Sequence, residues 1–257
     1  MRFLVTNDDG YLAPGIRAMA RSLDPLGEVV IVAPDREQSA TSHSLTLHHP
    51  LRARKIEERL WNVDGTPTDC VMLAVNALLD GKPDYVFSGI NHGGNMGEDV
   101  SYSGTVSAAM EGTLLGIPSI AISLVHGDER WMEGYEDVAR RLAKRIVSEP
   151  ERDVFQASTL LNINLPDRHP DEIRGVKVTT LGKRFYTDPV VVDKDPHGKT
   201  YYWIGGGAAT WESPEGSDYW AVEQGYISIT PIHLDLTHHH LIDRLRKWET
   251  TPLLAGA

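Results

Sequence analysis

The sequence predicts an α/β protein whose largely parallel, Rossmann-like sheet is flanked by helices. Its first half alternates short apolar runs with amphipathic segments, and this alternation implies right-handed crossovers between parallel strands. With 257 residues and 41% hydrophobic content, the chain can bury one substantial core. After about Pro170 short β-rich pieces follow, separated by Gly, Pro and Asp clusters, so we expect a C-terminal β-rich hairpin or arm and a terminal helix.

Local patterns predict the elements of the core in order. Apolar, β-branched runs indicate strands, whereas apolar residues at three- and four-residue spacing indicate helices. The expected strands are residues 2–7, 28–34, 84–90, 119–125 and 159–166, and the expected helices are residues 14–23, 67–81, 104–116 and 136–149.

The remaining segments predict extra strands at one edge of the sheet and a C-terminal β-rich part beyond the core. Residues 42–56 and 60–65 are expected to form extra strands, as an antiparallel edge of the sheet. Beyond the core we expect β-rich pieces at 176–187, 199–206 and 226–237, and a helix at 238–249 capped by Thr237. These patterns divide the chain into a Rossmann-like core, 1–170, and a β-rich arm and tail, 171–257, that partly completes the core.

Composition excludes several classes of partner. A formal net charge of −11 argues against binding to a nucleic-acid duplex, because such binding depends on Lys and Arg contacts with phosphates. No apolar run approaches the roughly 20 residues of a membrane span. The single cysteine, Cys70, is expected as a small buried hydrophobic residue in a reducing compartment, and we expect a cytoplasmic protein.

Two adjacent carboxylates, Asp8 and Asp9, follow the first predicted strand. Ligands of open α/β sheets bind at the carboxyl ends of the strands, so the pair lies where a site is expected. Because two close carboxylates repel, a pocket that holds both needs a cation or a proton between them. The alternative is a solvated acidic turn in which Asp9 caps the next helix, and the spacing alone leaves both interpretations open.

Two further loops bring polar groups to the same edge. Ser39 follows the second strand, and a glycine-rich loop after residue 90 carries Asn91, His92 and Asn95. Together with the two acids, Ser39 and Asn91 would supply only oxygen atoms, which favours magnesium, manganese or calcium over zinc or copper.

The tripeptide Ser103, Gly104 and Thr105 precedes a predicted helix. Amide groups at a helix N-terminus can bind an anion, helped by the helix dipole and, here, by two hydroxyls. The alternative is a plain N-cap formed by the serine.

Five motifs occur in an order that closely resembles the SurE family: NDDG at 7–10, APDREQSATS at 33–42, SGINHGGNMG at 88–97, YSGTVSAAMEG at 102–112 and YISITPIHLDLT at 226–237. Members of that family are stationary-phase survival proteins that act as metal-dependent nucleoside monophosphate phosphatases. The resemblance extends from the first residues to about residue 237.

The resemblance implies a role for each candidate residue. One divalent metal ion, Mg²⁺ or Mn²⁺ with Ca²⁺ as an inert occupant, is expected to be bound by Asp8, Asp9, Ser39 and Asn91, of which the two acids are catalytic. The substrate phosphate is expected to contact Asn95, Ser103, Gly104 and Thr105.

The resemblance also implies substrates and assembly. Nucleoside monophosphates are the expected substrates of a 5′-nucleotidase, and 3′-nucleotides and short polyphosphate are also admissible. The C-terminal hairpin and tail are expected to exchange between subunits, so that residues 171–257 also mediate a homodimer or a homotetramer.

Two alternatives concern the chemistry. Water is the preferred nucleophile, with direct attack by Asp8 or Asp9 as the alternative, and the general acid, for which His92 is a candidate, is not identified. A nucleotide-binding regulatory module without turnover is the alternative function. A dinucleotide-dependent dehydrogenase is poorly supported, because the first strand ends in NDDG and not in G-x-G-x-x-G.

Overall fold

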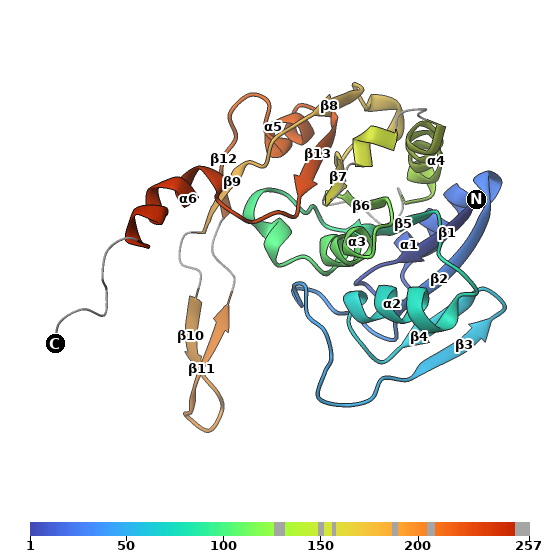
Figure 1. Cartoon of the computed structure of the whole chain (residues 1–257). Coiled ribbons are helices and arrows are strands. Elements are labelled where there is room, and N and C mark those ends of the chain that lie inside the picture. The colour runs from blue at the N-terminus through green and yellow to red at the C-terminus, as the bar shows by residue number, and fades with distance from the viewer. Residues whose placement is uncertain (126–131, 149–151, 156–157, 187–189, 205–208, 250–257) are drawn as a thin grey trace.

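A computed structural model describes residues 1–125, 132–148, 152–155, 158–186, 190–204 and 209–249 (Figure 1). At its centre lies a nine-stranded sheet. Across the sheet the strands are β3 (Ala53–Glu57), β4 (Leu60–Val63), β2 (Glu28–Pro34), β1 (Arg2–Thr6), β5 (Tyr85–His92), β6 (Ser119–Leu124), β7 (Thr159–Leu165), β13 (Ile227–His233) and β8 (Val176–Val178).

Neighbouring strands of this sheet are parallel, except for the antiparallel pairs β3–β4 and β7–β13. The predicted fold class, a largely parallel sheet flanked by helices, is therefore confirmed, including the antiparallel edge. The α-helices are α1 (Pro14–Leu23), α2 (Pro67–Leu73), α3 (Gly104–Leu114), α4 (Met132–Ser148), α5 (Asp218–Glu223) and α6 (His239–Leu245). Shorter helical segments are η1 (Asp24–Leu26), η2 (Ala74–Leu78), η3 (Gly97–Ser101), η5 (Arg152–Phe155), η6 (Pro170–Glu172) and η7 (Arg246–Trp248).

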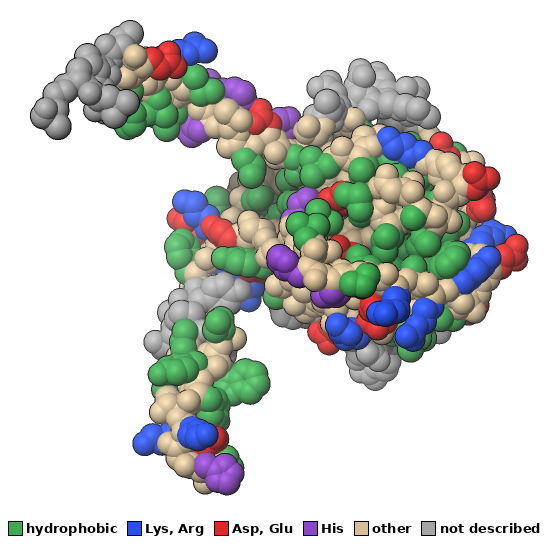
Figure 2. Space-filling view, turned by 60° about the horizontal axis from the view of Figure 1, so that its bottom comes forward, with side chains coloured by type: hydrophobic (Ala, Val, Ile, Leu, Met, Phe, Trp, Pro, Cys, Tyr) green, Lys and Arg blue, Asp and Glu red, His purple; other side chains and the backbone are tan. Residues whose placement is uncertain are grey.

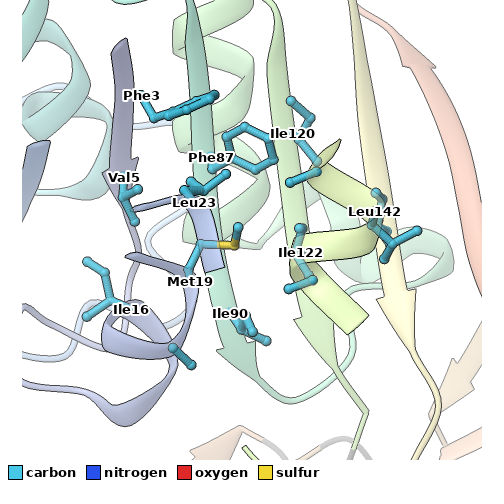
Figure 3. Close-up of a cluster of buried hydrophobic side chains, with 14 of the residues drawn as sticks. Phe3, Val5, Ile16, Met19, Leu23, Phe87, Ile90, Ile120, Ile122 and Leu142 are labelled. Carbon is cyan, nitrogen blue, oxygen red and sulfur yellow. The ribbon is translucent and has the colours of Figure 1, made fainter. Parts of the chain in front are cut away.

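Helices cover both faces of the sheet, because successive side chains of a buried strand point to opposite faces. Val5 of β1 packs in a cluster with Leu23 of α1 and Leu142 of α4 (Figure 3). The neighbouring Leu4 packs on the other face, with Cys70 of α2 and Ala108 of α3. The sheet and the helices on its two faces therefore form three layers. Cys70 is buried between them, as expected, and burial raises the pKa of its thiol well above the usual value.

The second half of the chain divides between the sheet and a projecting arm. Strands β8 and β13 extend the central sheet beyond β7. The other strands form two antiparallel pairs, β9 (Lys183–Tyr186) with β12 (Ala209–Glu212), and β10 (Val190–Lys194) with β11 (Thr200–Ile204). The β10–β11 hairpin and α6 project away from the body of the molecule (Figures 1 and 2).

Several predicted boundaries were wrong, because side chains bind backbone groups in ways that the local sequence pattern does not show. Of the strand expected at 42–56 only β3 forms, since Asp69 accepts hydrogen bonds from the amide and the hydroxyl of Thr46 (3.0 and 2.7 Å) and holds the preceding segment as a loop. Helix α6 is capped by His238, whose Nδ1 accepts from the amide of Leu241 (3.1 Å), and not by Thr237.

The β-rich piece expected at 176–187 forms two strands, β8 and β9, of which the first pairs with β13 and the second with β12. The short elements β10, β12 and α5 were not predicted. Among the described residues, no helix is long and apolar enough to cross a membrane.

Leu23→Ala should lower the free energy of unfolding by about 2–5 kcal/mol, because Leu23 is fully buried between α1 and the sheet and its truncation leaves a cavity. Leu47→Ala is the matched control, since that side chain is 80% exposed and should change stability by less than about 0.5 kcal/mol. Urea denaturation measures both. Equal losses in the two variants would contradict this packing.

Candidate active site

A cavity of about 590 Å³ lies where the carboxyl ends of β1, β2 and β5 meet the start of α3. This is the edge at which open α/β sheets bind ligands. Of the predicted site residues, those that line the cavity are Asp8, Ser39, Asn91, Asn95 and Ser103. The other three, Asp9, Gly104 and Thr105, are not in its lining but contact residues that are.

Asp8 is 4% exposed and lies against the first turn of α3. Its Oδ1 accepts a hydrogen bond from the hydroxyl of Thr105, and the amides of Gly104 and Thr105 also donate to the carboxylate. A Cβ atom at Gly104 would lie 2.9 Å from Asp8 Oδ2, so only glycine permits this approach. Burial raises the pKa of Asp8, and these hydrogen bonds lower it by a smaller amount.

Asp9 is half-buried beside Asp8, and its Oδ2 accepts from the backbone amide of His92 (3.2 Å). Burial, and after it the negative charge of Asp8, raise the pKa of Asp9 to about 6. Asp9 does not cap α1, whose N-cap is Ala13. The alternative of a solvated capping turn is therefore wrong, and the pair forms a partly buried site that favours a proton or a cation.

The loop after β2 runs along Asp8. The amide of Gln38 donates to the backbone carbonyl of Asp8 (2.7 Å), and the amide of Ser42 donates to the carbonyl of Tyr102 (3.1 Å). Between them the exposed Ser39 donates its hydroxyl to Glu37 Oε1 (2.8 Å). A hydroxyl that donates one hydrogen bond keeps its lone pairs, so the oxygen of Ser39 remains a possible ligand for a cation.

Asn91 lies at the end of β5, just after an irregularity in the pairing of β5 with β6 between Ser88 and Asn91. Such irregularities redirect side chains beside functional sites. The Nδ2 atom of Asn91 donates to the carbonyl of Gly93 (2.7 Å). With its nitrogen held by the loop, the side chain has a carbonyl oxygen as its remaining polar atom, and hard cations prefer such oxygens.

Asn95 is fixed by a buried polar network. Its Nδ2 donates to Ser123 Oγ (2.7 Å), and its amide donates to Asn164 Oδ1 (2.8 Å). Its carbonyl oxygen accepts from the side-chain amides of Asn162 (2.8 Å) and Asn164 (3.0 Å). The central sheet therefore holds this loop directly.

At Ser103–Thr105, where an anion site is expected, the structure shows an N-cap and contacts with Asp8. Ser103 caps α3, since its Oγ accepts from the amide of Val106 (3.1 Å), as in the plain N-cap interpretation. The amides of Gly104 and Thr105 contact the Asp8 carboxylate. Any further anion at this helix end therefore has to share the helix dipole with Asp8.

Sequence reasoning missed two groups of residues. Asn162 and Asn164 alternate within an otherwise apolar strand, and this period of two was a signal for a polar patch on one face of β7. Asp99, Tyr102, Arg184 and Ile204 also line the cavity. Nothing local indicated Arg184, because it belongs to the C-terminal β-rich part and reaches the cavity only through the tertiary fold.

The donor set fits a hard divalent cation. Within the part of the chain that the structure describes, no three His, Cys, Asp or Glu side chains cluster as metal ligands. A metal ion bound by the two acids would therefore need neutral oxygen ligands as well, and Ser39 and Asn91, which can supply them, line the same cavity. Two carboxylates with a hydroxyl and an amide oxygen are ligands that suit magnesium, manganese or calcium.

The fold and the cavity define an α/β protein with a polar, acidic ligand site at the carboxyl edge of its sheet. The family model described as survival protein SurE matches residues 3–188. The chain therefore belongs to the SurE family, and the resemblance seen in its motifs is confirmed.

Individual relatives support this assignment over nearly the whole chain. A 5′-nucleotidase SurE from Gemmatimonas aurantiaca is 53% identical over 255 residues, which cover 98% of this chain and 100% of that protein. One from Geotalea uraniireducens is 51% identical over 251 residues, with 98% and 100% covered. The crystal structure of the SurE protein from Aquifex aeolicus matches with a TM-score of 0.85 at 47% identity, and the match covers 97% of this chain and 100% of that one.

Asp9→Asn should stabilise the metal-free protein at pH 8 but have little effect at pH 4. Because folding raises the pKa of Asp9 from 3.8 to about 6, the folded state binds more protons than the unfolded state between these values. Stability therefore falls as pH rises through that window, and the neutral asparagine avoids the loss.

Thermal unfolding in a chelator measures this difference, with Asp171→Asn as the control because its side chain is 92% exposed. A stabilisation of the Asp9 variant that is the same at pH 4 and pH 8 would contradict the assigned burial.

Proposed function

We propose that this protein is a divalent-metal-dependent phosphomonoesterase that hydrolyses nucleoside monophosphates to nucleoside and phosphate, as a 5′-nucleotidase. The observation that carries the proposal is the buried Asp8 beside Asp9, in a cavity lined by neutral oxygen donors. Relatives named 5′-nucleotidase SurE, 53% and 51% identical over nearly the full length, support it. Activity on 3′-nucleotides and short polyphosphate is an extension of the same proposal.

We assign the metal to Asp8, Asp9, Ser39 and Asn91. Bound there, Mg²⁺ or Mn²⁺ supplies Lewis-acid stabilisation of the charge on the phosphoryl oxygens. Thr105 orients the Asp8 carboxylate through its hydroxyl, and hydrogen bonds from the α3 amides offset part of the rise in the pKa of Asp8 that burial causes. Asp9 is held in place by the amide of His92.

The phosphate itself is proposed to contact Asn95, Ser103, Gly104 and Thr105. Asn95 and Ser103 line the cavity, and the buried network behind Asn95 fixes its position before substrate binds. The positive end of the α3 dipole favours negative charge on the phosphoryl oxygens. Water is the proposed nucleophile, because Asp8 is buried and engaged by α3 and is therefore better placed to orient than to attack.

We further propose a homodimer or homotetramer in which the C-terminal part, 171–257, exchanges between subunits around the cores formed by residues 1–170. The projecting β10–β11 hairpin carries exposed hydrophobic side chains (Figure 2). Among them are Val192 (59% exposed), Tyr202 (67%) and Trp203 (66%). These side chains lie on both faces of the two-stranded hairpin, and exposed apolar surface of this kind is usually covered by another protein surface. The single buried Cys70 is compatible with the cytoplasm, where we propose that the protein acts.

Metal-stripped protein should release no phosphate from AMP or GMP until Mn²⁺ or Mg²⁺ is added, and Asp8→Asn should lower that release by at least about 100-fold, because the variant loses a charged ligand. A phosphate-release assay measures both, with Asp171→Asn, which lies outside the cavity, as the control. Nucleotide binding without release by the wild type at any metal concentration would refute turnover and indicate the regulatory module instead.

Trp203→Glu should reduce the molecular mass of the particle in solution, because a charge on the exposed face of the hairpin opposes burial against a second subunit. Sedimentation measures the mass, and circular dichroism checks that the fold persists. Leu47→Glu, a change at an 80% exposed position of the body, is the control and should leave the mass unchanged. An unaltered mass for the Trp203 variant would count against assembly through the hairpin.

A further inference from the structure

The cavity has a second wall, which comes from the arm. Arg184 of β9 lines it together with Ile204, the last residue of β11. The Nη1 atom of Arg184 pairs with the carboxylate of Asp99, and its guanidinium lies 5.0 Å from the ring centroid of Trp211. Trp211 in turn stacks on Tyr219, with ring centroids 4.3 Å apart. The guanidinium is therefore held by charge on one side and by an aromatic stack on another.

The buried carboxylate of Asp218 fixes the start of β9 to η3, on this side of the cavity. Asp218 is fully buried, and it accepts from the amide of Gly97 in η3 (2.9 Å) and from the amide of Gly182 just before β9 (2.8 Å). The amide of Arg184 donates to Glu98 Oε2 (2.7 Å). A Cβ atom at Gly97 would lie 2.9 Å from the carbonyl oxygen of Gly182, so the two segments are in close backbone contact. The wall is therefore formed before any ligand binds.

The chemistry of this wall differs from that of the acidic end. Tyr102, the residue before the cap of α3, lines the cavity and is 63% exposed, and Ile204 is 90% exposed. A tyrosine ring, a planar guanidinium and an aliphatic side chain all offer surfaces suited to a flat, uncharged ring. Asp99 compensates the charge of Arg184 and itself lines the cavity, so it would repel a phosphate group placed here.

We infer that Tyr102, Arg184 and Ile204 bind the heterocyclic base of the nucleotide, while its phosphate lies at the Asp8 end of the same cavity. The identity of the ligand rests on the proposed nucleotidase function. The volume of about 590 Å³ falls within the roughly 300–1,000 Å³ of small-molecule sites, which leaves room for a ligand that reaches both ends. Bases bind to proteins by stacking on aromatic rings and on guanidinium planes.

Adenosine provides the first test, because it carries the base but no phosphate and is not turned over. Isothermal titration should show that Tyr102→Ala and Arg184→Ala each weaken adenosine binding by about tenfold, the usual order for the loss of one stacking partner. Tyr102→Phe keeps the ring and should bind within about twofold of the wild type. Arg141→Ala is the matched arginine control, since that side chain is 82% exposed on α4.

Two results of this titration would overturn the inference. One is unchanged adenosine affinity in Tyr102→Ala, which replaces an exposed ring and is therefore expected to fold even if Arg184→Ala does not. The other is failure of the wild type to bind adenosine at millimolar concentration. Both results are independent of catalysis.

Turnover of AMP and of ribose 5-phosphate provides the second test, because the latter lacks the base. Tyr102→Ala should raise the KM for AMP about tenfold with little change in kcat, and should leave kcat/KM for ribose 5-phosphate within about twofold. Parallel losses for both substrates would overturn the inference, since they would place the wall at the phosphate. Absence of phosphate release by the wild type would instead refute the proposed function, and the adenosine titration would still decide whether the wall binds a base.

Discussion

The contact between the Asp8 carboxylate and the first turn of α3 determines the geometry of the site. A buried carboxylate is costly unless it is hydrogen-bonded, and here Thr105 and the neighbouring amides supply those bonds. Because Asp8 follows β1, the contact joins the end of a central strand to the start of a helix on one face of the sheet. Gln38 then binds the backbone of Asp8, which brings the loop that carries Ser39 to the same edge.

The electrostatics of this edge explain why an acidic protein can have an anion as its proposed substrate. The chain carries a formal net charge of −11. Burial raises the pKa values of both Asp8 and Asp9, and the charge of Asp8 also raises the pKa of Asp9. Since the amides of α3 already interact with Asp8, the helix dipole alone does not compensate a second anion. The arrangement therefore favours a hard cation between the carboxylates, and that cation would restore the attraction for phosphate.

The sequence predicted those features of the site that follow from local patterns, namely the strands and the polar residues at their ends. Asp8 and Ser39 follow buried apolar strands and Asn91 lies at the end of one, and the parallel topology brings such positions to one edge of the sheet. It could not predict that Asp69 would hold residues 42–52 out of a strand, because that hydrogen bond connects separate parts of the chain. Arg184 was missed for the same reason, and α5 because six residues are too short for a clear helical pattern.

The arm combines two parts with different physical roles. The β9–β12 pair is attached to the body of the molecule, since Asp218 accepts hydrogen bonds from the amides of both Gly97 in η3 and Gly182 before β9. Trp211 of β12 supports the guanidinium of Arg184. The hairpin beyond it exposes apolar side chains and contributes Ile204, at its end, to the cavity. A partner that covered the hairpin would therefore act on the cavity mainly through Ile204, because the Asp218 contacts hold Arg184 in place independently of the hairpin.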